Sequence, residues 1–439
     1  MKGKGLRLVR RALLAGMMAW AWPALAASTG SQVWTLQRSI ARAVAVAPEL
    51  RAAQADIRAS QGDVDKADDW PNPSVNIDVT NNIRRMYNEN GYTVGEFGYA
   101  QPLPLWRIKP QMEVAQEGLL ATQAGARQTR LDVEARIARL FLALQMRRDR
   151  LQLAEQRQAF ARQLIRSLKS GADDGDGADE AAIVRFIKPL DRARLQLLAQ
   201  TANGDADAAR NSYQEALDRF RNYLALAPDA PVRLPAMHAA SDPAPLPELM
   251  RQLTANAAVL RGLKHRLKQA EAGVALQKAR RVDDPVLSFV HGRNVNIYNF
   301  SYGYDSVQLS VSLPLWDQNK GNIEKAQAAV QRNRSRLDMA RRDLIGRLSQ
   351  DHLRLQHLLT QTRRFGSRVL QPAHRLLRDT ERHYDVGQAT SLALIDAYNT
   401  YFDAKNRYLD LLYRGQQSAM GLNWLLGRSL LQGDTAVRP

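Results

Sequence analysis

Strict alternation of apolar and polar residues marks four short segments of the chain and predicts four β-strands. In the clearest of them, every second residue from Val307 to Leu313 is apolar, and the residues between are serine or glutamine. Polar turns and an aromatic loop join the segments in pairs, as hairpins over 74–101 and 286–313. Each hairpin is expected to present one apolar and one polar face.

Between the strands, apolar residues recur at helical spacing over very long stretches. From Trp106 to about Ser170 the pattern is unbroken, and Ile137, Leu144 and Leu151 follow one another at seven-residue intervals. A helix of about 60 residues would be about 90 Å long, so it needs a coiled-coil neighbour. Further helices are predicted over 35–70 with a break near Pro48, over 181–225 running back beside the long helix, over 249–281, and after Trp316.

The sequence Leu-Pro-Leu-Trp occurs twice, each time after a predicted strand and before a long helix. Trp316 follows Trp106 by 210 residues and Pro285 follows Pro73 by 212. Two independent markers with nearly the same offset predict an internal duplication. Pro104, Trp106, Pro314 and Trp316 are then strand-to-helix junction residues. The expected divisions are a signal peptide at 1–27, a first repeat at 28–225, a Pro-rich linker at 226–247, a second repeat at 248–430 and a tail at 431–439.

Composition narrows the class of protein. Charged residues make up 24% of the 439 residues, too many for a bundle of membrane helices. The one long uncharged apolar run, 12–27, follows basic residues and ends in Ala24-Leu25-Ala26, which is typical of a secretory signal. The alternative, a single membrane anchor, needs about 20 apolar residues. The chain has no cysteine, and its formal charge of +18 is spread along helical surfaces, so no nucleic-acid partner is expected.

Four exported strands of this length could cross an outer membrane, which takes about 9–11 residues a strand. Four strands cannot close a barrel, and open edges are not tolerated in lipid. We therefore expect a mixed α+β, mostly helical subunit whose homotrimer shares a twelve-stranded barrel. Two alternatives remain: a soluble sandwich or β-stem, and a periplasmic coiled-coil scaffold that never contacts outer-membrane lipid.

The hairpins, the repeated Leu-Pro-Leu-Trp, the long helical pairs and the duplication resemble the TolC-like outer-membrane efflux channels over residues 30–430. The stretch 384–405, YDVGQATSLALIDAYNTYFDAK, is similar to the family's periplasmic tip, where the channel closes. Two positions differ from the motif, Ala389 and Ala393. The resemblance implies a constriction formed by Asp396, Asp191 and Tyr384, and adaptor contacts at Val386, Gly387, Thr390, Leu190 and Arg194.

Alternatives for these positions come from the residues themselves. Asp396 could instead be a helix N-terminal carboxylate stabilised by backbone N–H groups. The first-half tip carries an acidic insertion within 172–182 that does not have calcium-loop spacing and is interpreted as a solvated tip. His352 and His357 are five apart and point to different helix faces, so no metal site is predicted. We also expect no cofactor and no enzymatic activity, because no phosphate loop or nucleophile elbow occurs.

The resemblance implies passive conduction, a periplasmic adaptor and an inner-membrane pump of the RND type. The segment LPLWDQNKGNIEKAQAAV is similar to the outer-membrane members of cobalt–zinc–cadmium efflux systems, which favours heavy-metal cations as substrates. Two alternatives within the channel class are efflux of organic compounds and type I secretion of a polypeptide.

Overall fold

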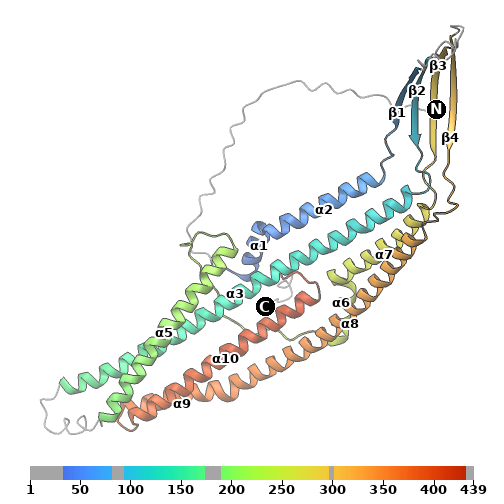
Figure 1. The fold of residues 1–439 in the computed structure, drawn as a ribbon. Helices are drawn as coiled ribbons and strands as arrows, with labels where there is room; N and C mark the ends of the chain where they lie inside the picture. Colours follow the sequence, from blue (N-terminus) through green and yellow to red (C-terminus); the bar gives the residue numbers. More distant parts are fainter. Residues whose placement is uncertain (1–32, 82–92, 174–188, 296–300, 432–439) are drawn as a thin grey trace, which may run out of the picture.

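The protein is elongated, with a β-sheet at one end and helix tips at the other (Figure 1). The computed structural model describes residues 33–81, 93–173, 189–295 and 301–431. The elements in chain order are α1 Leu36–Val46, α2 Pro48–Ala67, β1 Ser74–Asn81, β2 Thr93–Pro102, α3 Ile108–Asp173, α5 Pro189–Tyr223, α6 Leu246–Asn256, α7 Ala258–Ala279, β3 Val286–Val295, β4 Ser301–Ser310, α8 Lys320–Phe365, the π-helical turn Gly366–Leu370, α9 Gln371–Asp385 and α10 Ser391–Leu425. The mostly helical fold with a small sheet agrees with the sequence prediction. The predicted signal peptide, the acidic insertion from residue 174 and the C-terminal tail from residue 432 lie outside the described residues.

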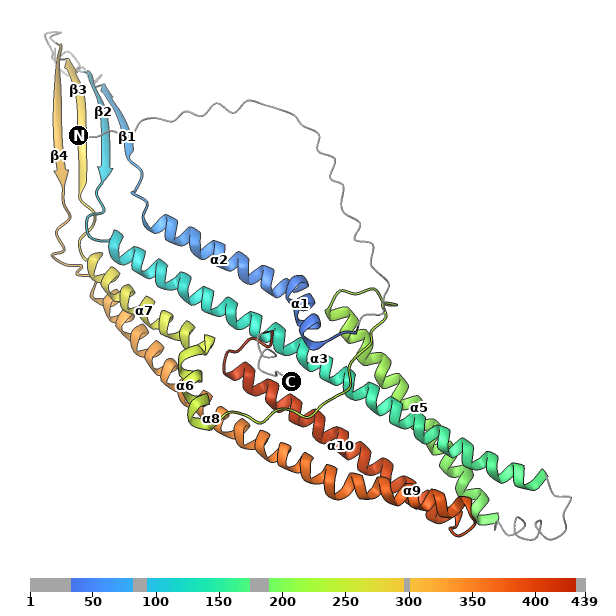
Figure 2. The same ribbon diagram turned by 180° about the vertical axis from the view of Figure 1, so that it is seen from behind.

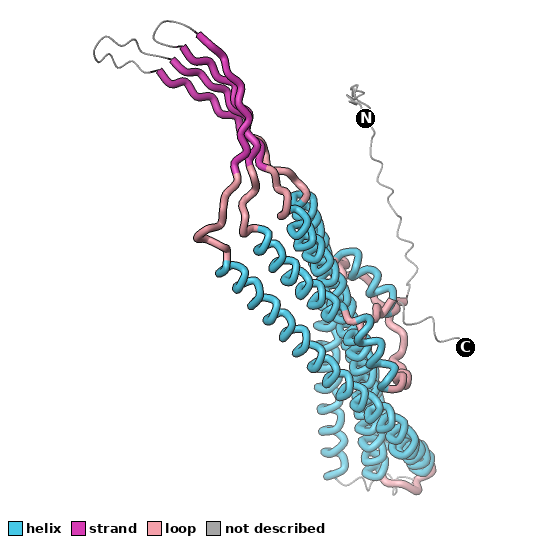
Figure 3. Tube along the Cα trace, turned by 90° about the vertical axis from the view of Figure 1, so that its right-hand side faces the viewer, coloured by secondary structure: helices cyan, strands magenta, loops and turns pink. Residues whose placement is uncertain are grey.

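The strands form one antiparallel sheet in the order β1-β2-β3-β4. Val75 on β1 is opposite Tyr99 on β2, Tyr99 is opposite Phe289 on β3, and Phe289 is opposite Val307 on β4. The two predicted hairpins are therefore adjacent, and β2 pairs with β3 across the middle of the chain. Figure 3 shows loops that join the strands to the helices at one end of the sheet.

The predicted limits of the last strand are wrong at both ends. β4 begins at Ser301, inside the expected aromatic loop, and ends at Ser310 although the apolar alternation continues to Leu313. Ser310 pairs with Val286, the first residue of β3, so β3 offers no partner further along. A strand ends where its neighbour ends, which period-two alternation alone does not reveal.

Long helices in antiparallel pairs extend from the sheet. α3 has 66 residues and α5 runs back along it, while α8 and α10 form the second pair (Figures 1 and 2). α2 lies beside α3, and α7 lies between α3 and α8. Clusters of fully buried residues hold each pair where its second helix ends. Ile137 and Leu144 of α3 cluster with Phe220 in the last turn of α5, and Leu348 and Leu355 of α8 cluster with Leu426 directly after α10.

The single helix predicted over 249–281 is divided at Ala257, whose backbone is extended at φ −59° and ψ 114°. No proline causes the break. Asn256 instead meets the chain beyond α10, where a Cβ on Gly427 would lie 2.8 Å from the Asn256 carbonyl oxygen. The Arg261 guanidinium donates to the same oxygen at 3.0 Å. Tertiary contacts therefore decide this helix end.

The Pro-rich segment predicted as a linker packs along the helices in an extended path. Gln145 on α3 donates to the carbonyl of Pro235 at 2.9 Å, and Gln416 on α10 donates to that of His238 at 3.0 Å. Met237 between them is buried. The segment thus joins the two helical pairs to each other as well as in sequence.

Candidate functional site

The turn between α9 and α10 is at the end of the molecule farthest from the sheet (Figure 1). Gly387 has φ +74°, a conformation that L-residues with a side chain rarely adopt. Its N–H donates to the Tyr384 carbonyl at 3.0 Å, and the Gln388 N–H donates to that of His383 at 2.8 Å. These two bonds form a Schellman motif, so Gly387 ends α9 for a definite steric reason. On the other side, the Thr390 hydroxyl accepts the Ala393 N–H at 3.2 Å and caps α10.

Tyr384 and Val386 have different environments in this turn. Tyr384 packs against a cluster whose buried members are Leu164, Leu195, Leu377, Leu394 and Ala397. Val386 is 67% exposed. Tyr384 is therefore part of the hydrophobic end of the helical assembly, whereas most of the Val386 side chain faces away from it.

Asp396 is exposed on α10, between the buried residues Leu394 and Ala397. α10 has no acidic residue in its first turn. The alternative of a carboxylate stabilised by the helix start is therefore disfavoured, because that effect is confined to the first turn. The neighbouring burial fixes the rotation of α10 and holds the Asp396 carboxylate on its surface.

The first-half tip residues lie at the same end of the molecule. Leu190 and Asp191 are in the first turn of α5, of which the structure describes the backbone, and Arg194 is exposed one turn further. The fold thus brings Asp191 and Asp396, which are 205 positions apart, to one end of the helical bundle.

Contacts between α3 and α10, which the sequence did not reveal, join the two halves near the tip. The Arg157 guanidinium donates to Asn399 at 3.0 Å and to Asp205 on α5 at 2.9 Å. Arg150 pairs with Asp410 at 2.7 Å. Arg157 on α3 therefore contacts two other helices, one of which belongs to the other half of the chain.

Aromatic rings reinforce the same contact. Tyr398 stacks on Phe160 and lies beside Phe402, with ring centroids 4.8 Å apart. Burial, and next the nearby Glu381 carboxylate, raise the pKa of the Tyr398 phenol, and burial raises the pKa of Tyr401. The tip is thus held by a partly buried cluster of uncharged tyrosines.

The sheet is strongly two-sided. One side, here called the apolar face, carries large apolar residues that are each 40–75% exposed, namely Val75, Ile77, Val79, Phe97, Tyr99, Leu287, Phe289, Val307 and Leu309. The opposite side carries mostly polar or small residues, among them Asn76, Asp78, Glu96, Ser288, Ser306 and Gln308. An exposed apolar surface of this extent normally contacts another protein or a membrane.

A polar contact crosses the opposite side of the sheet. The Tyr304 hydroxyl on β4 donates to the Glu96 carboxylate on β2. It passes over Gly292 on β3, and a Cβ at that position would overlap the tyrosine ring. Covering of a strand glycine by an aromatic ring is a known device that pins strand register.

The junction residues have unequal surroundings. The Trp106 indole N–H donates to the Val282 carbonyl at 3.1 Å, and Pro104 is buried. Trp316 is 91% exposed, and α8 begins only at Lys320 after the left-handed residue Asn319. The two Leu-Pro-Leu-Trp segments therefore lie in comparable places, but the chain covers Trp106 more than Trp316.

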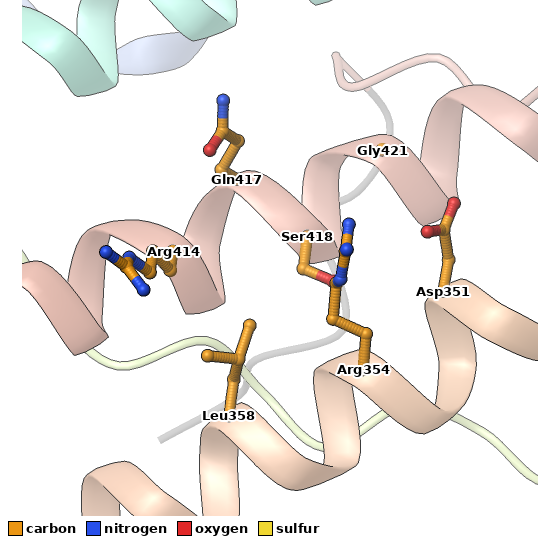
Figure 4. A pocket seen from close by; sticks show the side chains of 7 residues that line it. All are labelled: Asp351, Arg354, Leu358, Arg414, Gln417, Ser418 and Gly421. Atoms are coloured by element: carbon orange, nitrogen blue, oxygen red, sulfur yellow. The ribbon is translucent and has the colours of Figure 1, made fainter.

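A groove of about 540 Å³ lies between α8 and α10, and Figure 4 shows the side chains that line it. Its lining is Asp351, Arg354, Leu358, Arg414, Gln417, Ser418 and Gly421. Both arginines are exposed, and the groove lacks the enclosed apolar walls of a small-molecule site. The described ranges also contain no group of three or more His, Asp or Glu residues that could hold a metal ion. His352 is buried and contacts the Ala244 carbonyl at 3.2 Å, a structural role.

Comparison with known proteins identifies the family. The sequence profile described as "Outer membrane efflux protein" matches residues 39–224 and 249–428. The chain belongs to this family. Within the described ranges, no helix is sufficiently long and apolar to cross a membrane.

Two relatives carry metal-resistance names. The chain is 24% identical over 407 residues to the cobalt-zinc-cadmium resistance protein CzcC of Cupriavidus metallidurans, covering 90% of both chains. It is 23% identical over 306 residues to the nickel-cobalt-cadmium resistance protein NccC of Alcaligenes xylosoxydans xylosoxydans, covering 68% of this chain and 65% of that one.

Solved outer-membrane channels have the same fold. The gonococcal (Neisseria gonorrhoeae) channel MtrE in its open state has a TM-score of 0.69 at 18% identity, over 90% of this chain and 89% of that one. VceC from Vibrio cholerae has a TM-score of 0.69 at 16% identity, over 90% and 96%. CusC also has a TM-score of 0.69 at 16% identity, over 90% and 92%.

Proposed function

We propose that this chain is one of three identical subunits of an outer-membrane channel that passively conducts heavy-metal cations out of the cell. The observation that carries the proposal is the sheet. One face of the sheet is apolar and exposed, and the other face is mostly polar. The outer edges of β1 and β4 have no partner strand among the described residues. Such a sheet is stable in lipid only when its edges are joined.

Several copies can join these edges without changing the strand pattern. The sheet has an even number of antiparallel strands, so β4 of one copy runs antiparallel to β1 of a copy related by rotation. A closed ring is then wholly antiparallel, as bacterial outer-membrane barrels are. Three copies provide twelve strands, with the apolar faces toward lipid and the polar faces toward the lumen.

The helical pairs continue this barrel into the periplasm as a tunnel that ends at the tips. We interpret the two halves of the chain, each a hairpin followed by a long helical pair, as an internal duplication. Asp396, with Asp191 and Tyr384 near it, would narrow the closed mouth. The exposed turn at Val386 and Gly387, with Thr390, Leu190 and Arg194, would contact a periplasmic adaptor coupled to an inner-membrane pump. We expect no catalytic step, because conduction requires none.

The substrate class rests on the relatives named for cobalt, zinc, cadmium and nickel resistance. The experiment that tests it compares growth of a deletion strain, with and without the restored gene, across divalent metals, dyes, detergents and antibiotics. Hypersensitivity confined to the metals supports the proposal. Hypersensitivity to amphipathic organic compounds alone would instead assign the channel to organic efflux.

The channel itself is tested apart from its substrate. The purified protein should form a trimer in detergent and raise discrete conductance steps in planar bilayers. A monomeric protein that is recovered in the soluble fraction and conducts nothing would favour the periplasmic scaffold.

A further inference from the structure

We propose that β4 of one copy pairs with β1 of the next so that Leu309 is opposite Ile77, and that the next copy covers Trp316. This inference rests on the proposed trimeric channel and specifies its subunit interface. The partner is a second copy of this chain.

The template for this interface lies inside the chain, where the first hairpin meets the second. At that contact Gln101 on β2 is opposite Leu287 on β3, and Tyr99 is opposite Phe289. Just beyond the paired strands, the Leu103 N–H donates to the Pro285 carbonyl at 2.7 Å. The contact therefore has a definite register and a definite end.

The repeated sequence converts this template into a prediction for the outer edges. Counting from the two Leu-Pro-Leu-Trp segments, Tyr99 corresponds to Leu309; counting from Pro73 and Pro285, Phe289 corresponds to Ile77. The pair Tyr99–Phe289 thus predicts the pair Leu309–Ile77 between copies. The same mapping places Val311 opposite Val75, and Leu313 beside Pro73. Val311 and Leu313, which continue the alternation beyond β4, would then have partners.

The unequal tryptophans support the same arrangement. Trp106 is 38% exposed and donates to the Val282 carbonyl in the other half of the chain. Trp316 is 91% exposed. Counting from Pro73 and Pro285, which are 212 residues apart, the position equivalent to Val282 is Trp70, which is 58% exposed. In the trimer, Trp316 of one copy would donate to the chain of the next copy near Trp70.

The slope of the apolar face is an independent observation. Ile77 and Phe97 lie in one row across the sheet with His291 and Asp305, so this row is apolar on β1 and β2 and polar on β3 and β4. At the end of the sheet far from the helices, the apolar surface therefore stops closer to the helices on β3 and β4 than on β1 and β2. At the end near the helices, the row that contains Gln101 is polar on β2 but apolar on β3 and β4, where it contains Leu287 and Leu309. A band that crosses strands obliquely shows that the strands are tilted to the membrane normal.

The predicted register has a compatible tilt. Ile77 lies in the same row as Asp305 of its own copy, whereas Ile77 of the next copy is opposite Leu309, four residues further along β4. Over four strands the apolar band therefore shifts by four residues toward the helices. This is about one residue, or about 3.4 Å, for each strand spacing of about 4.8 Å. The strand tilt is then about 35°, at the lower end of the range of about 35–45° found in outer-membrane barrels. Local sequence, the in-chain template and barrel geometry therefore agree.

Cysteine pairing tests the register directly, because the natural chain has no cysteine. The double variant Ile77→Cys/Leu309→Cys, oxidised in intact outer membranes, is expected to yield mostly covalent trimers and dimers on a reducing-agent-free denaturing gel. Val75→Cys/Val311→Cys tests the same register at a second place. The matched controls are each single variant, Ile77→Cys/Val311→Cys, which is two residues out of register, and Ile77→Cys/Gln308→Cys, whose side chains lie on opposite faces.

The outcomes separate this inference from the proposed function. Trimers linked through Ile77→Cys/Val311→Cys but not through Ile77→Cys/Leu309→Cys would overturn the register and leave the channel intact. Absence of linkage in every pair, while the protein remains a trimer in detergent, would overturn the register alone; a monomer in detergent would overturn the trimeric channel as well. As a second measurement, Trp316→Ala is expected to lower the temperature at which the trimer dissociates; an unchanged temperature would contradict the covering of Trp316 by the next copy.

Discussion

The Glu134 carboxylate on α3 accepts a hydrogen bond from the Ser429 hydroxyl at 2.9 Å, although 295 residues separate them. It also accepts the Leu430 N–H at 3.0 Å and pairs with Arg130 at 3.1 Å. Glu134 is 1% exposed. One buried carboxylate thus attaches the segment after α10, in the second half, to the longest helix of the first half.

Replacing Glu134 should therefore loosen this attachment. Glu134→Ala removes the buried acceptor of the half-buried Ser429 and Leu430 donors, at a cost of about 1–3 kcal/mol in unfolding free energy. Denaturant unfolding in detergent, together with protease cleavage near residue 429, would measure the effect. The control Glu155→Ala removes a half-exposed carboxylate from the same helix and should cost less than about 1 kcal/mol.

Asp396 is predicted to limit conduction at the tip. If three copies converge there, Asp396→Ala should raise the single-channel conductance about twofold and weaken the preference for cations, because fewer carboxylates concentrate and retain them. Planar bilayer recordings provide the measurement. Asp403→Ala, two turns further along α10, is the matched control and should have a smaller effect. Equal conductance in wild type and Asp396→Ala would remove Asp396 from the constriction.

Gly387 should be sensitive to the smallest substitution. Gly387→Ala places a side chain at φ +74°, which costs about 1–2 kcal/mol. Amide exchange in the turn that follows α9 should accelerate about 5–30-fold. Gly346→Ala, in the exposed interior of α8, meets nothing within 4 Å and is expected to be neutral or stabilising by up to about 1 kcal/mol. Unaltered exchange in Gly387→Ala would contradict the strain argument.

Alkaline pH should weaken the tip through Tyr398. Burial raises the folded-state pKa of this phenol above the unfolded value of about 10, so folding favours the neutral form. This contribution is complete below pH 10 and is lost as the pH rises further. Thermal unfolding of wild type and Tyr398→Phe, compared from pH 8 to pH 11, should show the wild type losing more stability. Parallel curves would mean that Tyr398 ionises as freely when folded as when unfolded.

Gly292 is predicted to be required by the Tyr304–Glu96 contact. Gly292→Ala overlaps the tyrosine ring and should displace it, with a loss of about 0.5–1.5 kcal/mol for the hydrogen bond. Tyr304→Phe should reproduce the loss without the overlap. Gly95→Ala, where an added Cβ meets nothing within 4 Å, should leave the thermal stability nearly unchanged.

Residue patterns predicted the elements with local causes. Alternation at Val75 to Val79 and at Val307 to Leu309 predicted the strands, because a half-buried strand needs an apolar residue at every second position. Pro48 predicted the division between α1 and α2. By contrast, Ala257 divides α6 from α7 without any local signal. There the distant residue Gly427 lies close to the Asn256 carbonyl.

The sequence by itself determined the two hairpins, the long helices, the turn at Gly387 and the likeness of the two halves, because these depend on the spacing of residues near one another in the chain. Only the tertiary structure decided which distant residues meet. Packing between the halves decides the bonds of Glu134 to Ser429 and of Arg157 to Asn399, and the unequal burial of Trp106 and Trp316. Pairing with β3 decides the end of β4 at Ser310. A buried polar group must find a partner, but nothing in the local sequence states where along the chain that partner lies.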